Sequence, residues 1–488
     1  MEEQQLNELQ KVRREKLTQL KEQGIEPYGK KNPPKNVTEE INCNFEEFEG
    51  KPVSLSGRVM AKRGHGKAGF LNIRDFKGEI QVYGRKDRLN ENYPLFSTLD
   101  IGDFIYVEGE VFKTKRGEVS IKADKVQMLS KSLQPLPEKW HGLKDVELRY
   151  RQRYVDLIVN PDVKEVFIKR SRIIKEIRSY LDNLNYYEVE TPMMQTIAGG
   201  TSARPFSTYH NTLEQELFMR IAPELFLKRL VVGGFEKVYE LNRNFRNEGI
   251  STKHNPEFTM LELYQAHADY TDMMEITENM IAEVAQKVLG TTQITYQGQE
   301  IDLTPPWRRA TMLELVEEYT NIDFSTLDEE ESKQIAKEKG VAIDEGVWTW
   351  GKIVNYFFEE HVEEHLIQPT FVYGHPKDIS PLAKAQSEDE RLTERFEGFV
   401  FARELCNAFS ELNDPIDQRQ RFEQQMEEKA AGDDEAHEMD EDFVNALEFG
   451  MPPTGGLGIG IDRLVMLLTD SPSIRDVILF PTLKDKNL

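Results

Sequence analysis

Apolar and polar residues alternate in short segments along the first third of this chain. Between residues 51 and about 140, such segments are separated by turn signals such as Lys77-Gly78 and Arg116-Gly117. Period-two alternation over this length is typical of half-buried strands, so five strands are expected to close a small barrel. The expected strands are Val53–Met60, Phe70–Arg74, Glu79–Tyr83, Asp103–Phe112 and Glu118–Lys125.

Further along the chain, the pattern predicts two longer strands joined by a polar loop. The run from Phe235 to Leu241 has strand length, and a second strand follows the loop from Asn247 to Asn255. An antiparallel pair is therefore expected. In the second strand, Phe258, Met260, Glu262 and Tyr264 share one face, whereas Thr259, Leu261 and Leu263 share the other. One face is apolar and resembles a core, and the other carries reactive groups.

The loop between these strands concentrates charged groups. Arg246 and His254 are expected to face each other across its mouth, beside Glu248. Such groups are typical of a site that binds a nucleoside triphosphate without a phosphate-binding loop. The alternative is a surface hairpin with an incidental ion pair between Arg246 and Glu248, because exposed pairs of this kind are common and weak.

Three carboxylates, Glu397, Glu404 and Glu411, lie among apolar residues in a second segment. Burying an unpaired charge is costly, so these groups need a metal ion or a cationic ligand. Glu397 and Glu404 are on opposite faces of a straight strand, so a bend, bulge or tight turn is needed if both bind one Mg²⁺. A helix carrying both acids on one solvated stripe is the alternative.

A glycine-rich segment, Thr454 to Leu464, lies near the end of the chain. The acidic stretch through Glu448 and the pair Pro452-Pro453 precede it, so a dinucleotide-binding turn after a strand is excluded. Leu457, Ile459 and Ile461 alternate with glycines, which predicts a strand whose bare face lets a ligand come close. Arg463 is expected to open an apolar helix from Leu464 to Leu468.

With these segments in order, the chain resembles the class II aminoacyl-tRNA synthetases, and among them the bacterial lysine-specific enzymes. The first family motif is similar to Ser171 to Pro192, the second to Phe245 to Glu262, and the third to Gly456 to Arg463. The resemblance implies an α+β fold, with an antiparallel sheet flanked by helices and a homodimer interface at the first motif. The expected domains are 1–50, an N-terminal helix and lead-in; 51–145, an all-β OB-fold barrel; and 146–488, the catalytic domain with a helical insertion at about 307–385.

The resemblance also implies roles for the nucleotide site. Arg246 would bridge the α-phosphate of ATP and the substrate carboxylate, and Phe258 would stack on adenine. Arg246 and Arg463 are the expected catalytic residues, and Glu397 and Glu404 match the Mg²⁺ ligands. The remaining ATP contacts are Glu248, His254, Asn255 and Glu397. These roles agree with the chemistry, because fixed cations stabilise charge that builds on phosphate oxygens without a protein nucleophile.

The amino-acid pocket is where lysine would be distinguished from aspartate and asparagine, the substrates of similar enzymes. By the resemblance, Glu411 and Tyr264 receive the ε-ammonium group, and Glu224 and Glu262 lie near the α-amino group. A neutral substrate would leave Glu411 buried without a partner, which costs several kcal/mol (about 3 or more). Arg246 and the remaining lysine contacts, Gly200, Asn407 and Phe409, complete the pocket. Glu224 also follows Pro223, where a carboxylate stabilises a helix N-terminus.

In the resembling enzymes the barrel reads the tRNA anticodon, and Phe70, Gln81 and Glu118 match positions that touch bases. The net charge of −24 argues against indiscriminate nucleic-acid binding, yet residues 51 to 125 hold 15 Lys and Arg against 10 Asp and Glu. Small barrels serve many functions, so the barrel alone does not settle a base-reading role. The segment Leu129-Ser130-Lys131-Ser132 is similar to a signature loop of the other synthetase class, but the histidine-rich partner of that loop is missing.

The composition restricts the cellular location and the partners that can be expected for this chain. No stretch approaches the ~20 continuous apolar residues of a membrane span, and the charged N-terminus is unlike a signal peptide. The two cysteines, Cys43 and Cys406, exclude a disulfide framework and a zinc site. We expect a cytoplasmic homodimer whose partners are ATP, L-lysine and tRNA-Lys, with Mg²⁺ as cofactor and no membrane or DNA partner.

The sequence thus predicts a lysine–tRNA ligase that forms lysyl-adenylate and pyrophosphate and then passes lysine to the 3′-terminal ribose of its tRNA. An aspartate- or asparagine-specific sister enzyme is the first alternative, and Glu411 argues against it. A lysyltransferase acting on a protein is the second, and the barrel argues against it. A non-catalytic RNA-binding protein is the third, which the set Arg246, Glu397, Glu404 and Arg463 disfavours.

Overall fold

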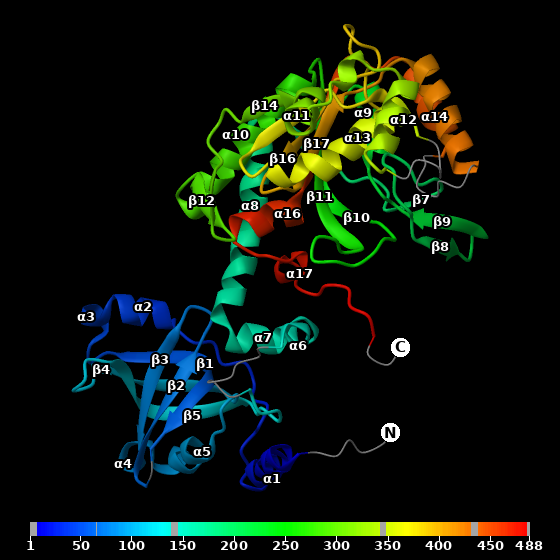
Figure 1. Ribbon diagram of the computed structural model, residues 1–488. Helices are drawn as coiled ribbons and strands as arrows, with labels where there is room; N and C mark the ends of the chain where they lie inside the picture. The colour runs from blue at the N-terminus through cyan, green and yellow to red at the C-terminus, as the bar shows by residue number, and fades with distance from the viewer. Residues whose placement is uncertain (1–6, 65, 138–144, 342–347, 431–437, 486–488) are drawn as a thin grey trace. The chain divides into compact units, whose positions relative to one another are not determined.

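The computed structural model describes residues 7–64, 66–137, 145–341, 348–430 and 438–485, and Figure 1 shows their course. The chain divides into two compact units, Met1–Lys144 and Asp145–Leu488. Each is described by itself. Among the described residues, none of the helices has both the length and the apolar character that crossing a membrane requires.

The first unit is a closed five-stranded barrel with the strand order β1-β2-β3-β5-β4. All neighbours are antiparallel except β3 and β5, which are parallel. The apolar residues of each strand alternate into one core, where Leu55, Ile73 and Val107 are fully buried. The predicted barrel is confirmed. Four strands are longer than expected, and β4 has the expected length but is shifted by one residue. The strands are β1 Pro52–Arg63, β2 Ala68–Arg74, β3 Glu79–Arg85, β4 Phe104–Lys113 and β5 Val119–Ser130.

Helix α1 (Glu8–Glu22) belongs to the same unit and begins with a capping box formed by Asn7 and Gln10. The remaining short helices close the ends of the barrel or connect its strands. They are α2 Thr38–Cys43, α3 Phe45–Phe48, α4 Lys86–Leu89, η1 Asn90–Asn92 and α5 Tyr93–Thr98.

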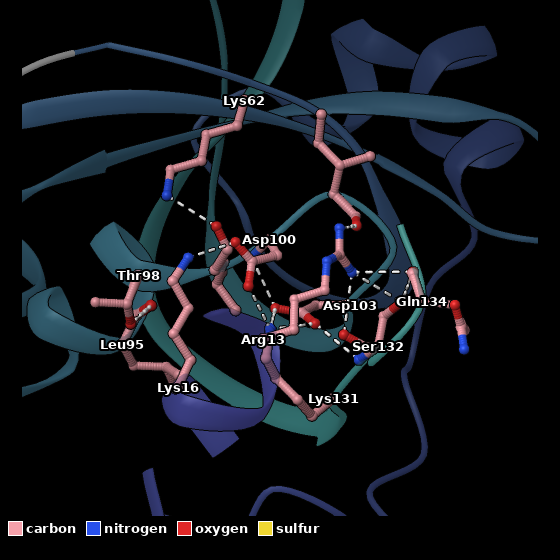
Figure 2. Close-up of polar contacts among 12 residues, drawn as sticks. Arg13, Lys16, Lys62, Leu95, Thr98, Asp100, Asp103, Lys131, Ser132 and Gln134 are labelled. Carbon is pink, nitrogen blue, oxygen red and sulfur yellow. Dashed lines mark hydrogen bonds and ion pairs between the residues drawn. The ribbon is translucent and has the colours of Figure 1, made fainter. Parts of the chain in front are cut away.

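A buried polar network holds α1 against the barrel (Figure 2). Lys16 Nζ lies 2.5 Å from Asp100 Oδ1, and Lys131 Nζ lies 2.7 Å from Asp100 Oδ2 and 2.9 Å from Asp103 Oδ1. Arg13 donates to the backbone oxygens of Ser132 and Ile101 at 3.0 and 2.8 Å. Burial by itself would raise the pKa of Asp100, but Lys131 and Lys16 outweigh burial and lower it. Lys131 is therefore a structural residue of the barrel.

The second unit is built on an eight-stranded sheet with the order β14-β15-β16-β17-β18-β11-β10-β6. The pairs β14–β15 and β10–β6 are parallel, and the other neighbours are antiparallel. The predicted α+β class with a large antiparallel sheet is confirmed. The strands are β6 Tyr187–Glu188, β10 Lys237–Phe245, β11 Glu257–Ala266, β14 Arg308–Thr311, β15 Thr370–Tyr373, β16 Arg395–Phe399, β17 Glu404–Ser410 and β18 Thr454–Gly460.

One face of this sheet carries the main hydrophobic core. Helices α8 (Pro161–Asn183), α10 (Tyr270–Leu289) and α16 (Ile461–Leu468) pack there. In α8, Ile173, Ile177 and Leu181 recur every four residues and are fully buried. They meet Leu261 and Leu263 of β11, which are also fully buried. The apolar face predicted for β11 is confirmed.

The opposite face of the sheet is only partly covered. Helix α9 (Glu224–Val232) packs there with α15 (Glu441–Glu448), and α11 (Met312–Thr320) and α13 (Trp350–His361) pack near the β14 edge. The other elements are α6 Val146–Arg151, α7 Arg153–Val159, β7 Met194–Gln195, β8 Ser207–His210, β9 Gln215–Met219, β12 Gln293–Tyr296, β13 Gln299–Asp302, η2 Phe324–Thr326, α12 Glu329–Glu338, η3 Glu363–His365, η4 Lys377–Ile379, α14 Pro415–Ala430 and α17 Ile474–Val477.

Several boundaries of the second unit differ from the sequence-based expectation. Strand β10 spans Lys237–Phe245, whereas Phe235 to Leu241 was expected. Helix α8 begins at Pro161, ten residues before Ser171, where the first family motif begins, because proline suits the first helical position. Helix α16 begins at Ile461, which was expected to end the preceding strand. The region 307–385, expected to be helical, also contributes β14 and β15 to the edge of the sheet.

Candidate active site

Strand register builds the candidate site as two rows of side chains across the open face of the sheet. Glu262 of β11 pairs with Gly458 of β18, which pairs with Asn407 of β17, which pairs with Glu397 of β16. The next row, two residues along each strand, is Tyr264, Gly456, Phe409 and Arg395. Since side chains two apart point the same way, both rows face the same space.

The two rows form the floor of the candidate site, and the central strand β18 contributes only backbone to this floor. A Cβ atom added at Gly456 would lie 1.9 Å from Glu411 Oε1 and 2.7 Å from Tyr264 Cε1. The bare strand face predicted from the glycine pattern is therefore real at Gly456, where no side chain fits. The glycines leave the centre of the floor low, and polar side chains of the neighbouring strands surround it.

A cavity of about 320 Å³ lies over this floor. Every residue that the sequence assigned to ATP, lysine or metal in the second unit lines it. They are Gly200, Glu224, Arg246, Glu248, His254, Asn255, Phe258, Glu262, Tyr264, Glu397, Glu404, Asn407, Phe409, Glu411 and Arg463. The structure thus brings them together, and their individual roles stay predictions.

At one end of the cavity, cations lie beside an aromatic ring. The Arg246 guanidinium lies 5.1 Å from the centre of the Phe258 ring, and the backbone N–H of Arg246 donates to Pro256 O at 2.9 Å. Among the described residues, Arg246 has no ion pair with Glu248, so the alternative of a surface hairpin tied by that pair is wrong. Burial lowers the pKa of Arg246, and its Nε has no hydrogen-bond partner within the described part of the chain. This end suits a planar, anionic ligand.

His254 and Arg463 approach each other from opposite segments at this end. Arg463 Nη2 lies 3.5 Å from His254 Nε2, and Ser251 Oγ lies 3.1 Å from His254 Nδ1. Burial, and then the charge of Arg463, lower the pKa of His254. The imidazole is therefore neutral at pH 7 in the free protein, and it meets a ligand as a hydrogen-bonding group beside a fixed cation.

Glu397 and Glu404 lie on neighbouring strands that a tight turn connects. Phe401 and Ala402 adopt positive φ angles of 54° and 52° in this turn, and the register shifts between Gly398 and Phe399. The predicted tight turn is thus present, and the helical alternative is wrong. Both carboxylates line the cavity, so the turn overcomes the opposite-face geometry of a straight strand.

Each carboxylate of this pair has a cationic neighbour. Arg395 Nη2 lies 2.6 Å from Glu397 Oε1, and Arg463 Nη1 lies 3.2 Å from Glu404 Oε2. Burial raises the pKa of Glu397 to about 7, and the charge of Glu404 adds to this rise. Burial also acts on Glu404, but Arg463 outweighs it and lowers the pKa of that group. The two groups thus resist carrying two negative charges unless more positive charge arrives.

Two hard oxygen donors of this kind fit a small divalent cation. Mg²⁺ is usually held by one or two carboxylates, with water and phosphate oxygens supplying the remaining ligands. Within the described part of the chain, no group of three or more His, Cys, Asp or Glu side chains is placed to hold a metal by itself. The pair therefore fits a cation that arrives with a phosphate ligand.

At the other end of the cavity, three buried carboxylates converge. Glu224, Glu262 and Glu411 are 6%, 6% and 2% exposed. Burial raises the pKa of Glu262 to about 8 and that of Glu411 to about 8, and it also raises the pKa of Glu224. The fully buried Lys228 lies 2.7 Å from Glu224 Oε1 and 2.5 Å from Glu411 Oε2. This end suits a ligand that carries positive charge.

Two residues of the site were missed by the sequence-based prediction. Arg395 lines the cavity and hydrogen-bonds both Asn407 Oδ1, at 3.0 Å, and Glu397. Its place in the row after Phe409 follows only from the register. Lys228 was read as part of an ordinary helix after Glu224. Its spacing of four from Glu224 was the available signal, because such residues are neighbours on a helix.

In the barrel unit, the three predicted base-contacting residues lie near one another. Phe70 pairs with Tyr83 across β2 and β3, with ring centres 4.7 Å apart, and Asn72 pairs with Gln81. Gln81 Nε2 donates to Glu118 Oε2 at 3.0 Å. Phe70 and Tyr83 are half-buried, and Gln81 is buried and also accepts from Ser120 Oγ at 3.0 Å. The surface therefore offers partly exposed ring faces on which bases can stack.

Comparison with known proteins agrees with both units. A family model described as tRNA synthetases class II (D, K and N) matches residues 145–484. Another, described as OB-fold nucleic acid binding domain, matches residues 53–129. The lysine–tRNA ligase of Carboxydothermus hydrogenoformans is 62% identical over 100% of both chains. Those of Syntrophomonas wolfei and Pelotomaculum thermopropionicum are 60% and 61% identical over 99% of this chain and 98% and 96% of theirs.

Proposed function

This chain belongs to the class II tRNA synthetases of the aspartate, lysine and asparagine group, and from that premise we propose that it is an ATP-dependent lysine–tRNA ligase. It joins L-lysine to ATP as lysyl-adenylate with release of pyrophosphate, and then transfers lysine to the 3′-terminal ribose of tRNA-Lys. The observation that carries the proposal is the single cavity with cations and Phe258 at one end and three buried carboxylates at the other.

In this proposal, adenine stacks on Phe258 and the α-phosphate lies against Arg246. The carboxylate of lysine also binds Arg246, which brings it in line with the α-phosphorus. Negative charge then develops on the phosphate oxygens, where the fixed cations Arg246 and Arg463 stabilise it. The attacking carboxylate is already ionised, so the first step needs no general base. Glu248, His254 and Asn255 complete the nucleotide contacts.

Glu397 and Glu404 hold the divalent metal that the reaction of this family needs, and we propose that the ion is Mg²⁺. When bound, such an ion would neutralise negative charge on the phosphate groups. Arg395 supports this arrangement because it ties Glu397 to Asn407 and so joins the metal end to the amino-acid end.

Selection for lysine rests on the length and charge of the pocket. Glu411 and Tyr264 receive the ε-ammonium group, Phe409 packs against the aliphatic stem, and Glu224, Glu262 and the backbone at Gly200 surround the α-amino group. An aspartate or asparagine side chain would bring no ammonium group to Glu411, so the buried Glu411 and Glu224 would have to share the charge of Lys228, at a cost of about 3 kcal/mol or more. The sister specificities are therefore disfavoured.

We propose that residues 51–145 read the anticodon through Phe70, Gln81 and Glu118, while residues 146–488 carry out the chemistry. A homodimer is proposed through α8 and the adjoining strand β6. The exposed Tyr187 and Phe235 support this interface, because their rings meet at 6.1 Å at that edge of the sheet and remain 64% and 42% exposed. We place the activity in the cytoplasm, where its tRNA substrate is used, and propose no membrane or DNA partner.

Amino-acid-dependent exchange of labelled pyrophosphate into ATP, run without tRNA across all twenty amino acids, tests the proposal. Exchange with lysine alone is expected. Exchange with aspartate or asparagine would move the chain to a sister specificity. A protein with no exchange for any amino acid would not be an adenylating enzyme.

A further inference from the structure

Lys228 is a buried cation beneath the floor of the amino-acid end, and no step proposed above uses it. It lies on α9, four residues after Glu224, and its side chain is 0% exposed. Its Nζ lies 2.7 Å from Glu224 Oε1 and 2.5 Å from Glu411 Oε2. Lys228 does not line the cavity, whereas both carboxylates do. The ammonium therefore faces the two carboxylates from the side away from the ligand.

The surroundings of Lys228 fix this position. The rings of Phe409 and Phe443 lie 5.8 and 5.4 Å from Nζ, so aromatic faces flank the charge. Because the side chain of Lys228 is fully buried, its ammonium group is not exposed to water. Lys228 contacts one oxygen of each carboxylate, Glu224 Oε1 and Glu411 Oε2. Glu411 Oε1 has no hydrogen-bond partner among the described residues, so it keeps acceptor capacity for a ligand.

The count of charges at this end explains why such a cation is needed. Three carboxylates, those of Glu224, Glu262 and Glu411, converge there, and L-lysine brings two ammonium groups. The substrate brings one ammonium group fewer than there are carboxylates, and a buried carboxylate without a cation in contact with it is strongly unfavourable. Lys228 supplies the third positive charge. The substrate carboxylate has its own partner in Arg246.

We propose that Lys228 is a positioning residue for lysine selection: fixed beneath the cavity, its ammonium favours the ionised forms of Glu224 and Glu411 and orients both carboxylates to receive the two ammonium groups of the substrate. This inference rests on the proposed function. Lys228 does not contact the substrate. Recognition of the substrate lysine therefore depends on a lysine side chain of the protein that lies outside the cavity.

Other charged groups face this cluster from each neighbouring element. Strand β11 presents Glu262 and Tyr264, and β16 presents Arg395, whose charge acts on Glu224. Arg220 and Arg246 act on Glu262. From α15, Asp440 is directed to Arg229, 2.7 Å away, and not to Lys228. Lys228 is thus the cation in contact with both Glu224 and Glu411.

The directions of the pKa shifts of Glu411 and Glu224 agree with this geometry. Burial raises the pKa of Glu411 to about 8 and raises that of Glu224, and in both cases the charge of Lys228 opposes the rise. Without this charge, both carboxylates would hold their protons to still higher pH. The protonated forms cannot pair with an ammonium group, so lysine use would begin only at more alkaline pH.

The test replaces Lys228 in the full-length protein and follows lysine-dependent pyrophosphate exchange across neutral and alkaline pH. Lys228→Met removes the charge at similar size, and Lys228→Gln removes it but keeps a polar end. In both, the rising limb of kcat/KM for lysine should move upward by about one pH unit or more. The KM for lysine at neutral pH should rise by about tenfold or more, while the KM for ATP stays within about twofold.

Arg229→Met is the matched control on the same helix. It removes a largely buried cation that pairs with Asp440 instead of the pocket, so it should lower thermal stability without moving the pH limb. Lys228→Arg keeps the charge and should keep the wild-type limb. This variant decides the question if the two neutral variants do not fold, because an upward shift with the charge retained would overturn the proposal.

If the neutral variants fold and kcat/KM for lysine rises over the same pH range as in the wild type, the role proposed for Lys228 is overturned. Lysine-dependent exchange by the wild type would still support the ligase function. Equal increases in the KM values for lysine and ATP would also overturn the role of Lys228, because they indicate general damage to the site. If the wild-type protein itself shows no exchange with lysine, the proposed function fails, and this inference fails with it.

Discussion

Replacing Gly456 by alanine tests the placement of the amino-acid end more directly than removal of any polar group. The new Cβ would lie 1.9 Å from Glu411 Oε1, whereas ordinary contacts begin at 3.4 Å, so the carboxylate must move by about 1.5 Å. Glu411 is 2% exposed and already lies 2.5 Å from Lys228 Nζ, which limits where it can go. The backbone of β18 is equally constrained, since it pairs on both sides.

A displacement of about 1 Å in a reacting complex can cost a factor of about 100. We therefore expect Gly456→Ala to lower kcat/KM for lysine by about 100-fold or more, which corresponds to about 2.7 kcal/mol. Pyrophosphate exchange should be measured with lysine and ATP varied separately. The KM for ATP should change little, because the nucleotide end lies over other parts of the floor.

Gly455→Ala is the matched control on the same strand. Its Cβ would meet Asp269 O at 2.8 Å and Met273 Cε at 3.0 Å on the core face, and Gly455 does not line the cavity. This variant should melt at a lower temperature and keep the wild-type KM for lysine. If folded Gly456→Ala protein uses lysine as the wild type does, Glu411 does not receive the substrate where the structure places it.

Four further predictions address the charges, the metal and the barrel. Glu411→Gln should raise the KM for lysine by about 100-fold and leave that for ATP unchanged, and equal increases in both would contradict the pocket assignment. Because burial raises the pKa of Glu411 and Glu262 to about 8, each carboxylate gains its charge as pH rises, so kcat/KM for lysine in the wild type should rise through about pH 8; a rate that falls over this range would refute the reasoning. Chelation should abolish exchange and Mg²⁺ should restore it, and Glu397→Gln should need about tenfold more Mg²⁺ for half-maximal rate, a change that a non-binding role would not produce. Phe70→Ala should raise the KM for tRNA by about tenfold, from loss of about 1 to 3 kcal/mol of stacking, with exchange unaltered; a parallel fall in exchange would show that the barrel and the chemistry are not separable in this way.

Much of the site could be predicted because its chemistry follows local patterns. Alternation along β11 placed Phe258, Glu262 and Tyr264 on one face, and the glycines of β18 indicated a bare strand. Two carboxylates seven apart required a turn between them, and the turn is present. In each case one segment contained both the residues and the periodicity that oriented them.

The features that could not be predicted from the sequence depend on contacts between distant segments. Arg395 joins the site only through the register of β16 with β17, which no local pattern records. Lys228 follows Leu225-Phe226-Leu227, where a lysine is usually expected to extend its charged end to water. Its burial depends on Glu411 and Phe443, about two hundred residues further along the chain. Strands β14 and β15 have four residues each, too few for a period-two pattern to stand out in a helix-rich region.

The register of the central sheet has a consequence for how the protein acquires activity. Met260 pairs with Gly460, and Gly458 lies between Glu262 and Asn407, so the strands that carry the site come from widely separated parts of the chain. Such pairings form late, because a long loop must close before they give any stabilisation. A one-residue slip of β18 would also turn its side chains onto the floor. During synthesis, the floor therefore cannot exist until the last strand emerges, and a chain released before residue 454 would lack the strand that joins β11 to β17.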